Sequence, residues 1–273
     1  MFSEDQKIIQ RIAPAMQRVL IVDPQPASAR MLADILRNYF PCQVWIAPTR
    51  AKAVELMQAV MPEVVFIEMA GTEIDGIELT RQLRRSELFC RKVPVIMMTA
   101  TATAQGILAA RDAGVHEFLR KPFTTKDLLR RLEAVVLRSR GWIEAVAYVG
   151  PDRRRFNSAE FTGARKRKVD HVQNPQQAAI DQAFKILKSA TFALAAEPAQ
   201  ALRSMRAQAA DLVAAGKATG DARLGYAAAD LQRFLSGIRL ISIDNSAEVL
   251  IKAGALLKLA PPEMAPAPEK VAA

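Results

Sequence analysis

The fold follows from residues 64–76, which read Val64-Val65-Phe66-Ile67-Glu68-Met69-Ala70-Gly71-Thr72-Glu73-Ile74-Asp75-Gly76. Four consecutive apolar residues that run into an acid are typical of a strand buried on both faces, as in the centre of a parallel sheet. The carboxyl ends of such strands carry the ligand sites of open α/β sheets. Glu68 therefore lies where a site is expected, although an exposed acid ending a strand is the simpler interpretation of this residue by itself.

Strands and helices alternate through the first half of the chain. Short apolar runs predict strands at residues 18–23, 43–47, 64–68, 93–99 and 115–119. Apolar residues at three- and four-residue spacing predict helices between and after them, at residues 31–40, 51–60, 76–85, 104–113 and 124–138. This alternation predicts an α/β fold with a doubly wound parallel sheet of five strands.

Polar side chains stand at the ends of four of these strands. Asp23 follows the first strand, Glu68 the third and Thr99 the fourth, and Lys121 follows the fifth. Because the carboxyl ends of parallel strands share one edge of a sheet, we expect these four residues to converge there.

In order and spacing, these landmarks resemble the receiver domain of two-component response regulators over about residues 17–138. The motifs that carry the resemblance are the run at residues 19–23, the Asp75-Gly76 turn eight residues after Glu68, the run at residues 94–100, and Lys121-Pro122-Phe123. The resemblance implies a CheY-like, flavodoxin-like domain that acts in bacterial phosphorelay signal transduction. It also implies a cis peptide bond between Lys121 and Pro122.

The resemblance assigns a role to each strand end. In that family an aspartate after strand three accepts a phosphoryl group from a histidine kinase, and a pair of acids after strand one helps to hold Mg²⁺. A hydroxyl after strand four binds a phosphoryl oxygen, and the lysine pairs with the charge. The corresponding residues here are Glu68 for the acceptor, Asp23 and Pro24 for the acid pair, Thr99 for the hydroxyl and Lys121 for the lysine.

Two of these positions depart from the family pattern. Glu68 displaces the nucleophile by one methylene, and Pro24 supplies no side-chain oxygen to a metal, which leaves Asp23 as the remaining acid. We therefore expect a degenerate receiver, a pseudo-receiver that is not an enzyme, needs no cofactor and binds Mg²⁺ weakly or not at all. The resemblance places the switching aromatic residue at Phe118, for which packing in strand five is an equal alternative.

The charge of Glu68 leaves two interpretations open. Its carboxylate could occupy part of the phosphoryl position and bind Lys121 and Thr99, which would resemble a locked active state. Alternatively, Glu68 and Lys121 are an ion pair that only supports the fold.

The remainder of the chain differs in composition. Residues 1–16 are an expected N-terminal extension, and residues 139–175 an expected linker with eight Lys and Arg against four Asp and Glu. Residues 176–260 show four amphipathic segments, the third running to Ile241 and the fourth capped at Asn245-Ser246, which predict an all-α helical bundle. Residues 261–273 are an expected disordered tail.

Other residue types indicate no further site. Cys42 and Cys90 stand far apart and are expected as buried, reduced thiols, while His116 and His171 are expected at the surface and in the linker. The predicted bundle contains no histidine, which excludes histidine phosphotransfer there. Because no long uncharged apolar run or secretory signal occurs, we expect a cytoplasmic protein without membrane contact.

Three functions compete at this point. The leading hypothesis is a phosphorylation-independent adaptor in two-component signalling that binds protein partners, a histidine kinase or another regulator among the candidates, with a homodimer left open. The second is a DNA-binding transcriptional regulator that uses the basic linker or the bundle, although nucleic acid is the less favoured partner. The third is a receiver that still accepts phosphate.

Overall fold

The computed structural model describes residues 4–71, 73–138, 140–153 and 175–261. The chain divides into two compact units, Met1–Ile143 with Tyr148–Glu160, and Glu144–Ala147 with Phe161–Ala273. His171, the basic residues at 154–168 and the expected disordered tail from residue 262 lie outside the described residues.

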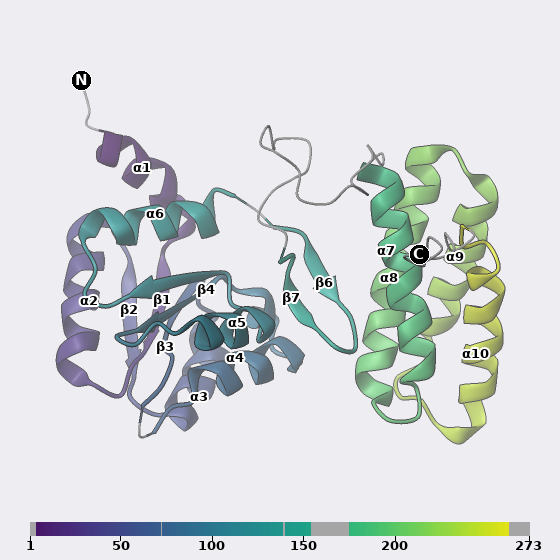
Figure 1. Ribbon diagram of the computed structural model, residues 1–273, viewed down its shortest axis with the longest axis horizontal. Helices are drawn as coiled ribbons and strands as arrows, with labels where there is room; N and C mark the ends of the chain where they lie inside the picture. The colour runs from purple at the N-terminus through teal and green to yellow at the C-terminus, as the bar shows by residue number, and fades with distance from the viewer. Residues whose placement is uncertain (1–3, 72, 139, 154–174, 262–273) are drawn as a thin grey trace, which may run out of the picture. The chain divides into compact units, whose positions relative to one another are not determined.

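The first unit is built on a parallel sheet of five strands, as predicted, and the structure gives the strand order β2-β1-β3-β4-β5 (Figure 1). The strands are β1 (Arg18–Val22), β2 (Gln43–Ala47), β3 (Val64–Glu68), β4 (Val95–Thr99) and β5 (Glu117–Arg120). Every residue of β3 and β4 is buried, because helices cover both faces of the sheet. The opening stretch is therefore the central strand that its apolar run predicts.

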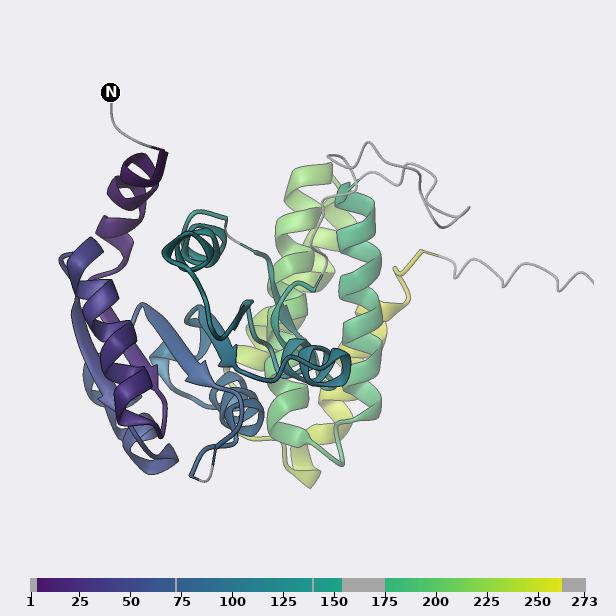
Figure 2. The ribbon, with the colours of Figure 1, turned by 60° about the vertical axis from the view of Figure 1, so that its left-hand side comes forward.

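Alternate residues of each strand face opposite layers of helices. One layer contains α1 (Glu4–Ile12), α2 (Pro26–Tyr39) and α6 (Thr125–Val136), and the other contains α3 (Arg50–Val60), α4 (Gly76–Arg85) and α5 (Ala104–Asp112). Figures 1 and 2 show the sheet between these layers. Two short 3-10 helices, η1 (Ala13–Ala15) and η2 (Phe89–Lys92), complete the unit.

Two strands start later than predicted. Strand β4 begins at Val95, not Val93, because Val93 still donates a backbone hydrogen bond to Cys90 and closes η2. Strand β5 begins at Glu117, because Val115 still bonds to Ala110 at the end of α5. In both places, the turn before the strand contains apolar residues, and they made the predicted strand too long.

The N-terminal extension is part of the first core. Helix α1 packs against α6, and Ile12 and Met16 are fully buried beside α6 residues such as Leu132. Residues 4–12 of the expected N-terminal extension therefore form an amphipathic helix on the sheet unit.

Part of the expected linker is a hairpin with strands β6 (Trp142–Glu144) and β7 (Val149–Pro151). In the first unit, Arg84 of α4 is fully buried and lies 5.4 Å from the centre of the Trp142 ring. Burial lowers the pKa of its guanidinium to about 9. The buried cation is therefore still charged near neutral pH, and neighbouring acceptors must satisfy it.

Arg84 finds these acceptors in neighbouring loops. Its guanidinium donates to the carbonyl oxygens of Gly114 at 2.9 Å, Arg91 at 2.6 Å and Val93 at 2.9 Å, and contacts Nδ1 of His116 at 3.2 Å.

The expectation that His116 is a surface residue is wrong. Its ring is partly buried, and Nδ1 also accepts a bond from the backbone N–H of Val95 at 3.2 Å. Burial, with Arg84 and Arg140 nearby, lowers the pKa of His116 to about 2, so the ring is neutral. His116 therefore acts as a hydrogen-bond acceptor at the start of β5.

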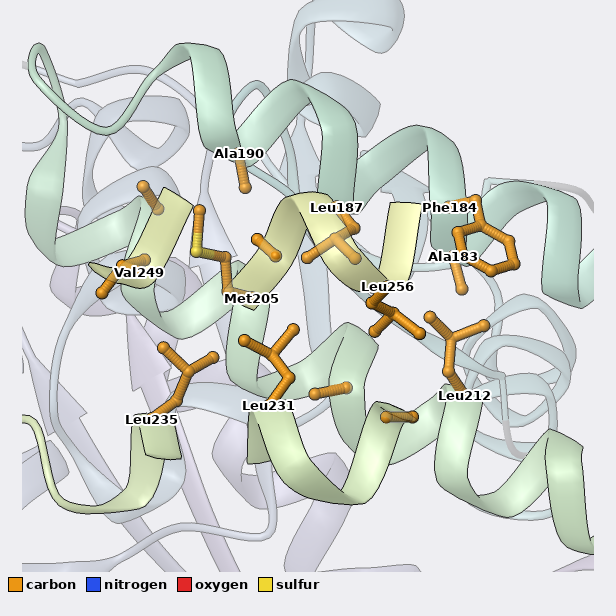
Figure 3. Packing of buried hydrophobic residues seen from close by; sticks show 14 of the residues in the cluster. Ala183, Phe184, Leu187, Ala190, Met205, Leu212, Leu231, Leu235, Val249 and Leu256 are labelled. Carbon is orange, nitrogen blue, oxygen red and sulfur yellow. The ribbon is translucent and has the colours of Figure 1, made fainter. Parts of the chain in front are cut away.

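The second unit contains a bundle of α7 (Pro175–Phe192), α8 (Pro198–Thr219), α9 (Ala222–Ser236) and α10 (Ile243–Leu257). Its core is apolar and alanine-rich, with Leu187, Met205, Leu231 and Leu256 among the residues that meet in the centre (Figure 3). The small alanine side chains let the helices pack closely.

Two boundaries in the bundle correct the sequence interpretation. Helix α9 ends at Ser236, and Ile238 and Ile241 lie in the following loop, where they still pack against the core and so continue the apolar pattern. Helix α10 is capped by Ser242, with Asn245 three residues further on completing a capping box.

Arg84→Met is expected to lower the free energy of unfolding by about 3 kcal/mol, because it leaves buried carbonyl oxygens without a donor. Urea unfolding followed by tryptophan fluorescence measures the change. Arg81→Met, on the exposed side of the same helix, removes the same charge and serves as the control. Equal stability of the two variants would contradict a structural role for Arg84.

Candidate functional site

Three of the four predicted polar side chains meet at the carboxyl edge of the sheet. Asp23 follows β1, Glu68 ends β3, and Lys121 follows β5, and their side chains are bonded to one another. Asp23 is 1% exposed and Glu68 9% exposed, so the carboxylates are largely withdrawn from water. The cluster therefore lies where the strand pattern predicts it.

The loop after β3 holds Glu68 in place through a close backbone approach. A Cβ added at Gly76 would lie 2.2 Å from the carbonyl oxygen of Glu68, so only glycine fits at the start of α4. The N–H of Gly76 donates to Met69, and Asp75 caps the helix by accepting from the N–H of Glu78 at 2.9 Å. The Asp75-Gly76 turn thus presses the helix onto the end of β3.

The ammonium of Lys121 is the centre of the cluster. Its Nζ lies 2.5 Å from Oε2 of Glu68, 2.8 Å from Oδ2 of Asp23 and 2.8 Å from Oγ of Ser28. An ammonium has three N–H groups, so these three contacts use all of its donors. Lys121 is therefore fully bonded within the protein.

Ser28 is a member of the cluster that the sequence analysis missed. It lies in the first turn of α2, donates to Oδ2 of Asp23 at 2.8 Å and accepts from Lys121. The other oxygen of Asp23 accepts from the backbone N–H of Gln25 at 2.9 Å. A hydroxyl residue one turn into the helix that follows an acid-ended strand is the signal that could have identified it.

The surroundings of Lys121 shift its pKa in two directions. Burial lowers the pKa of the ammonium, and hydrogen bonds to Asp23 and Glu68, with the negative charges of both, raise it by more. The net result is a raised pKa, so the ammonium keeps its proton across the physiological range.

Pro24 closes the loop beside this cluster. A Cβ added at Gly71 would lie 2.6 Å from Cγ of Pro24, which places the proline ring directly against the loop after β3. Pro24 has no side-chain oxygen, and both oxygens of Asp23 already accept bonds from protein donors. A hard Mg²⁺ ion needs several oxygen ligands. Asp23 and Glu68, both bonded to Lys121, and Pro24, which offers no oxygen, do not fit such an ion.

Among the described residues, the hydroxyl of Thr99 bonds to Thr101 and not to the acids. Its hydroxyl donates to the carbonyl oxygen of Thr101 at 3.2 Å and accepts from the Thr101 N–H at 3.1 Å. Of the two contacts in the first interpretation of Glu68, the structure therefore has the bond to Lys121, which the second interpretation shares, and not the bond to Thr99. Phe118 is half-buried and packs against the core layer under α3, α4 and α5.

Three further expectations concern the rest of the chain. The Lys121-Pro122 peptide bond is cis, as the resemblance implies. Cys42 and Cys90 are free thiols, and Cys90 is buried as expected, whereas Cys42 is only partly buried. Across the described ranges, no helix has both the length and the apolarity that crossing a membrane requires.

Comparison with known proteins shows similarity to one family of domains. The sequence profile of the response regulator receiver domain matches residues 19–133. The transcriptional regulatory protein TrcR of Mycobacterium tuberculosis is 27% identical over 122 residues, which cover 45% of this chain and 46% of that protein. The DNA-binding dual master transcriptional regulator RpaA of Synechocystis is 29% identical over 124 residues, 45% of this chain and 51% of that protein. The chain thus spans about half the length of the curated relatives it matches.

Solved structures of receiver domains cover a similar share of the chain. The signal receiver domain of a DNA binding response regulator from Colwellia psychrerythraea is 24% identical, with a TM-score of 0.42, and covers 44% of this chain and 98% of that chain.

Lys121→Met is expected to lower the free energy of unfolding by about 3 kcal/mol near pH 7, because it leaves two buried carboxylates without their cation. The pKa of Lys121 is higher in the folded chain than its unfolded value of about 10.4. Its stabilisation is therefore complete below that pH and is lost as the pH rises through the folded pKa.

From about pH 7, the difference in unfolding free energy between wild type and Lys121→Met should hence stay constant up to about pH 10 and shrink above it. Denaturant melts at a series of pH values measure this difference. Lys126→Met, at an exposed position, is the control and should change stability by less than about 0.5 kcal/mol throughout. A difference that grows with rising pH would show that the ammonium does not stabilise the cluster.

Proposed function

Residues 19–133 of this chain are a response regulator receiver domain, followed by a helical region, and on this premise we propose that the protein signals without being phosphorylated. Its role is that of an atypical response regulator in two-component signal transduction, a binding protein and not an enzyme. The receiver presents one surface to a protein partner, and the helical unit binds a second partner.

The observation that carries this proposal is the position of the Lys121 ammonium. It lies between Asp23 and Glu68 and uses all three of its donors on protein oxygens. Phosphoryl transfer depends on metal ions and cations that are free to neutralise the charge of the incoming group. Here the available cation is already bound to the acids of the site.

The two departures in sequence act together with this ion pair. The extra methylene of Glu68 lets its carboxylate reach Lys121 at 2.5 Å, and Pro24 packs on Gly71 where a second acid would supply an oxygen. Because transfer to a carboxylate requires precise alignment of nucleophile and phosphoryl group, a displaced acceptor is a poor nucleophile. These features favour one permanent state over a phosphorylation switch.

Partners follow from the family. A receiver domain interacts with histidine kinases, and a kinase or another regulator fits the role of partner for the receiver surface. We propose that binding uses the state in which Glu68 and Lys121 are paired, since the pair keeps the edge of the sheet in one arrangement.

A second function is favoured by two observations. The relatives TrcR and RpaA are described as a transcriptional and a DNA-binding regulator, and residues 139–175 are rich in Lys and Arg. Titration of the full chain with duplex DNA at several salt concentrations separates the two functions, because neutralisation of phosphates makes the affinity fall steeply with salt.

The wild-type chain is expected to gain no phosphoryl group when it is incubated with a small-molecule phosphodonor and Mg²⁺. Intact mass spectrometry would detect an increase of about 80 Da. The matched control is the double variant Pro24→Asp with Glu68→Asp, which restores both acids of the family pattern and should gain the group. A stable adduct at Glu68 in the wild-type chain would overturn the proposal.

Glu68→Gln keeps the size of the side chain, removes the charge that binds Lys121, and is expected to weaken partner binding about tenfold while the fold stays intact. Quantitative capture from native lysate, with full-length wild type and variant as baits, measures the change. Glu55→Gln, at an exposed position, is the control. If Glu68→Gln lowers the melting temperature but leaves partner affinity unchanged, the ion pair only supports the fold.

A further inference from the structure

A stripe of polar residues crosses the buried face of helix α8. Gln200, Ser204 and Gln208 follow one another at four-residue spacing and therefore lie on one side of the helix. They are 4%, 0% and 3% exposed. Polar side chains inside an apolar bundle destabilise it unless they are hydrogen-bonded, so this stripe, which we call the α8 stripe, requires an explanation.

The α8 stripe binds a short segment of the second unit, residues 144–147, which we call the tip. Nε2 of Gln200 donates to the carboxylate of Glu144 at 3.1 Å and to the carbonyl oxygen of Ala145 at 3.2 Å. Nε2 of Gln208 donates to the carbonyl oxygen of Glu144 at 3.4 Å. Two glutamines thus bind both the backbone and the acid of the tip.

Arg203 sets the direction of the Gln200 amide. Its guanidinium donates to Oε1 of Gln200 at 2.8 and 3.1 Å. Because Oε1 is held by these donors, the NH₂ group of the amide is directed at the tip. The stripe is therefore oriented to donate to an incoming carboxylate and to backbone carbonyls.

Val146 supplies the apolar part of the same contact. It is 7% exposed and belongs to the core cluster that contains Leu187 and Met205, whereas its neighbour Ala147 is exposed. In the tip, the bundle therefore contacts an acid, the backbone of a small residue, and a β-branched apolar residue two positions after the acid.

The tip leaves one member of the α8 stripe unsatisfied. The hydroxyl of Ser204 is fully buried between the two glutamines and has no hydrogen-bond partner among the described residues. An unpaired buried hydroxyl destabilises a fold by about 1–3 kcal/mol. A segment with one more polar group at this position would give the Ser204 hydroxyl a hydrogen-bond partner. The tip offers no such group.

We propose that the α8 stripe is a docking site for an extended segment of a partner protein with the pattern acid, small residue, β-branched residue, and that the tip occupies the site until the partner displaces it. Glutamine amides bind the acid and the backbone of that segment, and its apolar side chain takes the place of Val146 in the core cluster. The inference rests on the proposed adaptor role, since it names the chemistry of a partner for the helical unit. Its test uses no phosphodonor, so it can fail while the function proposed for the receiver stands.

The test uses a fluorescent peptide of residues 142–149 as probe and the full chain with the substitution Val146→Asp as its target. The substitution places a charge in the apolar core cluster and so expels the tip. Fluorescence anisotropy should show at least about tenfold tighter binding of the probe to Val146→Asp than to wild type, in which the tip competes. Ala147→Asp adds the same charge at an exposed position of the tip and should bind the probe as weakly as wild type.

Two further arms test the chemistry of the site. Adding Gln200→Leu and Gln208→Leu to the Val146→Asp chain should weaken probe binding about tenfold, whereas Gln177→Leu at an exposed position should not. A probe with Asp in place of the valine that corresponds to Val146 should not bind. Circular dichroism checks that each variant keeps its helices, and Val146→Ser, which adds no charge, replaces Val146→Asp if that variant loses them.

Three results would overturn the proposal. The first is equal affinity of the probe for wild type and for the chain with an expelled tip, and the second is binding that does not depend on Gln200 and Gln208. The third is a wild-type dimer, seen by light scattering, that dissociates in the Val146→Asp chain, because the occupant would then be the tip of a second copy.

Discussion

The bond between the Lys121 ammonium and two carboxylates is the interaction on which the carboxyl edge of the sheet depends. Asp23, Glu68 and Lys121 come from the ends of three different strands, and one ammonium with three donors joins them through Asp23, Ser28 and Glu68. Two buried negative charges held near each other would repel strongly in the absence of a cation. The arrangement is therefore stable only while Lys121 stays between them.

In the function proposed here, two differences from the family pattern in side-chain chemistry favour this internal pair over a site for an ion and a phosphoryl group. The additional methylene of Glu68 extends the carboxylate to the lysine, and the ring of Pro24 fills space against Gly71 without offering an oxygen. A divalent ion demands a nearly complete set of oxygen ligands, whereas an ammonium needs three acceptors in loose geometry. The monovalent cation of the protein itself is thus the better match for the side chains that remain.

Buried polar groups elsewhere in the chain follow the same physical rule. Arg84 in the first unit and the α8 stripe in the second are withdrawn from water, and nearly all of their polar atoms bind backbone carbonyls or a neighbouring side chain. The unpaired hydroxyl of Ser204 is the exception among the described residues. Buried polar groups destabilise a fold when they have no hydrogen-bond partner. An exception therefore marks a place where a further contact is worth seeking.

The sequence by itself determined the five-stranded parallel sheet, the four helices of the second unit and the strand ends that carry Asp23, Glu68 and Lys121. These features depend on local patterns, because buried strands need continuous apolar runs and helices need apolar residues at three- and four-residue spacing. Only the tertiary structure decided which partners Lys121 takes, that Thr99 turns to Thr101, and that Ser28 joins the cluster. It also decided that His116 and Arg84 are buried together and that the tip lies on the α8 stripe. Those contacts join residues far apart in the chain, and the direction of a side chain depends on neighbours that no local pattern specifies.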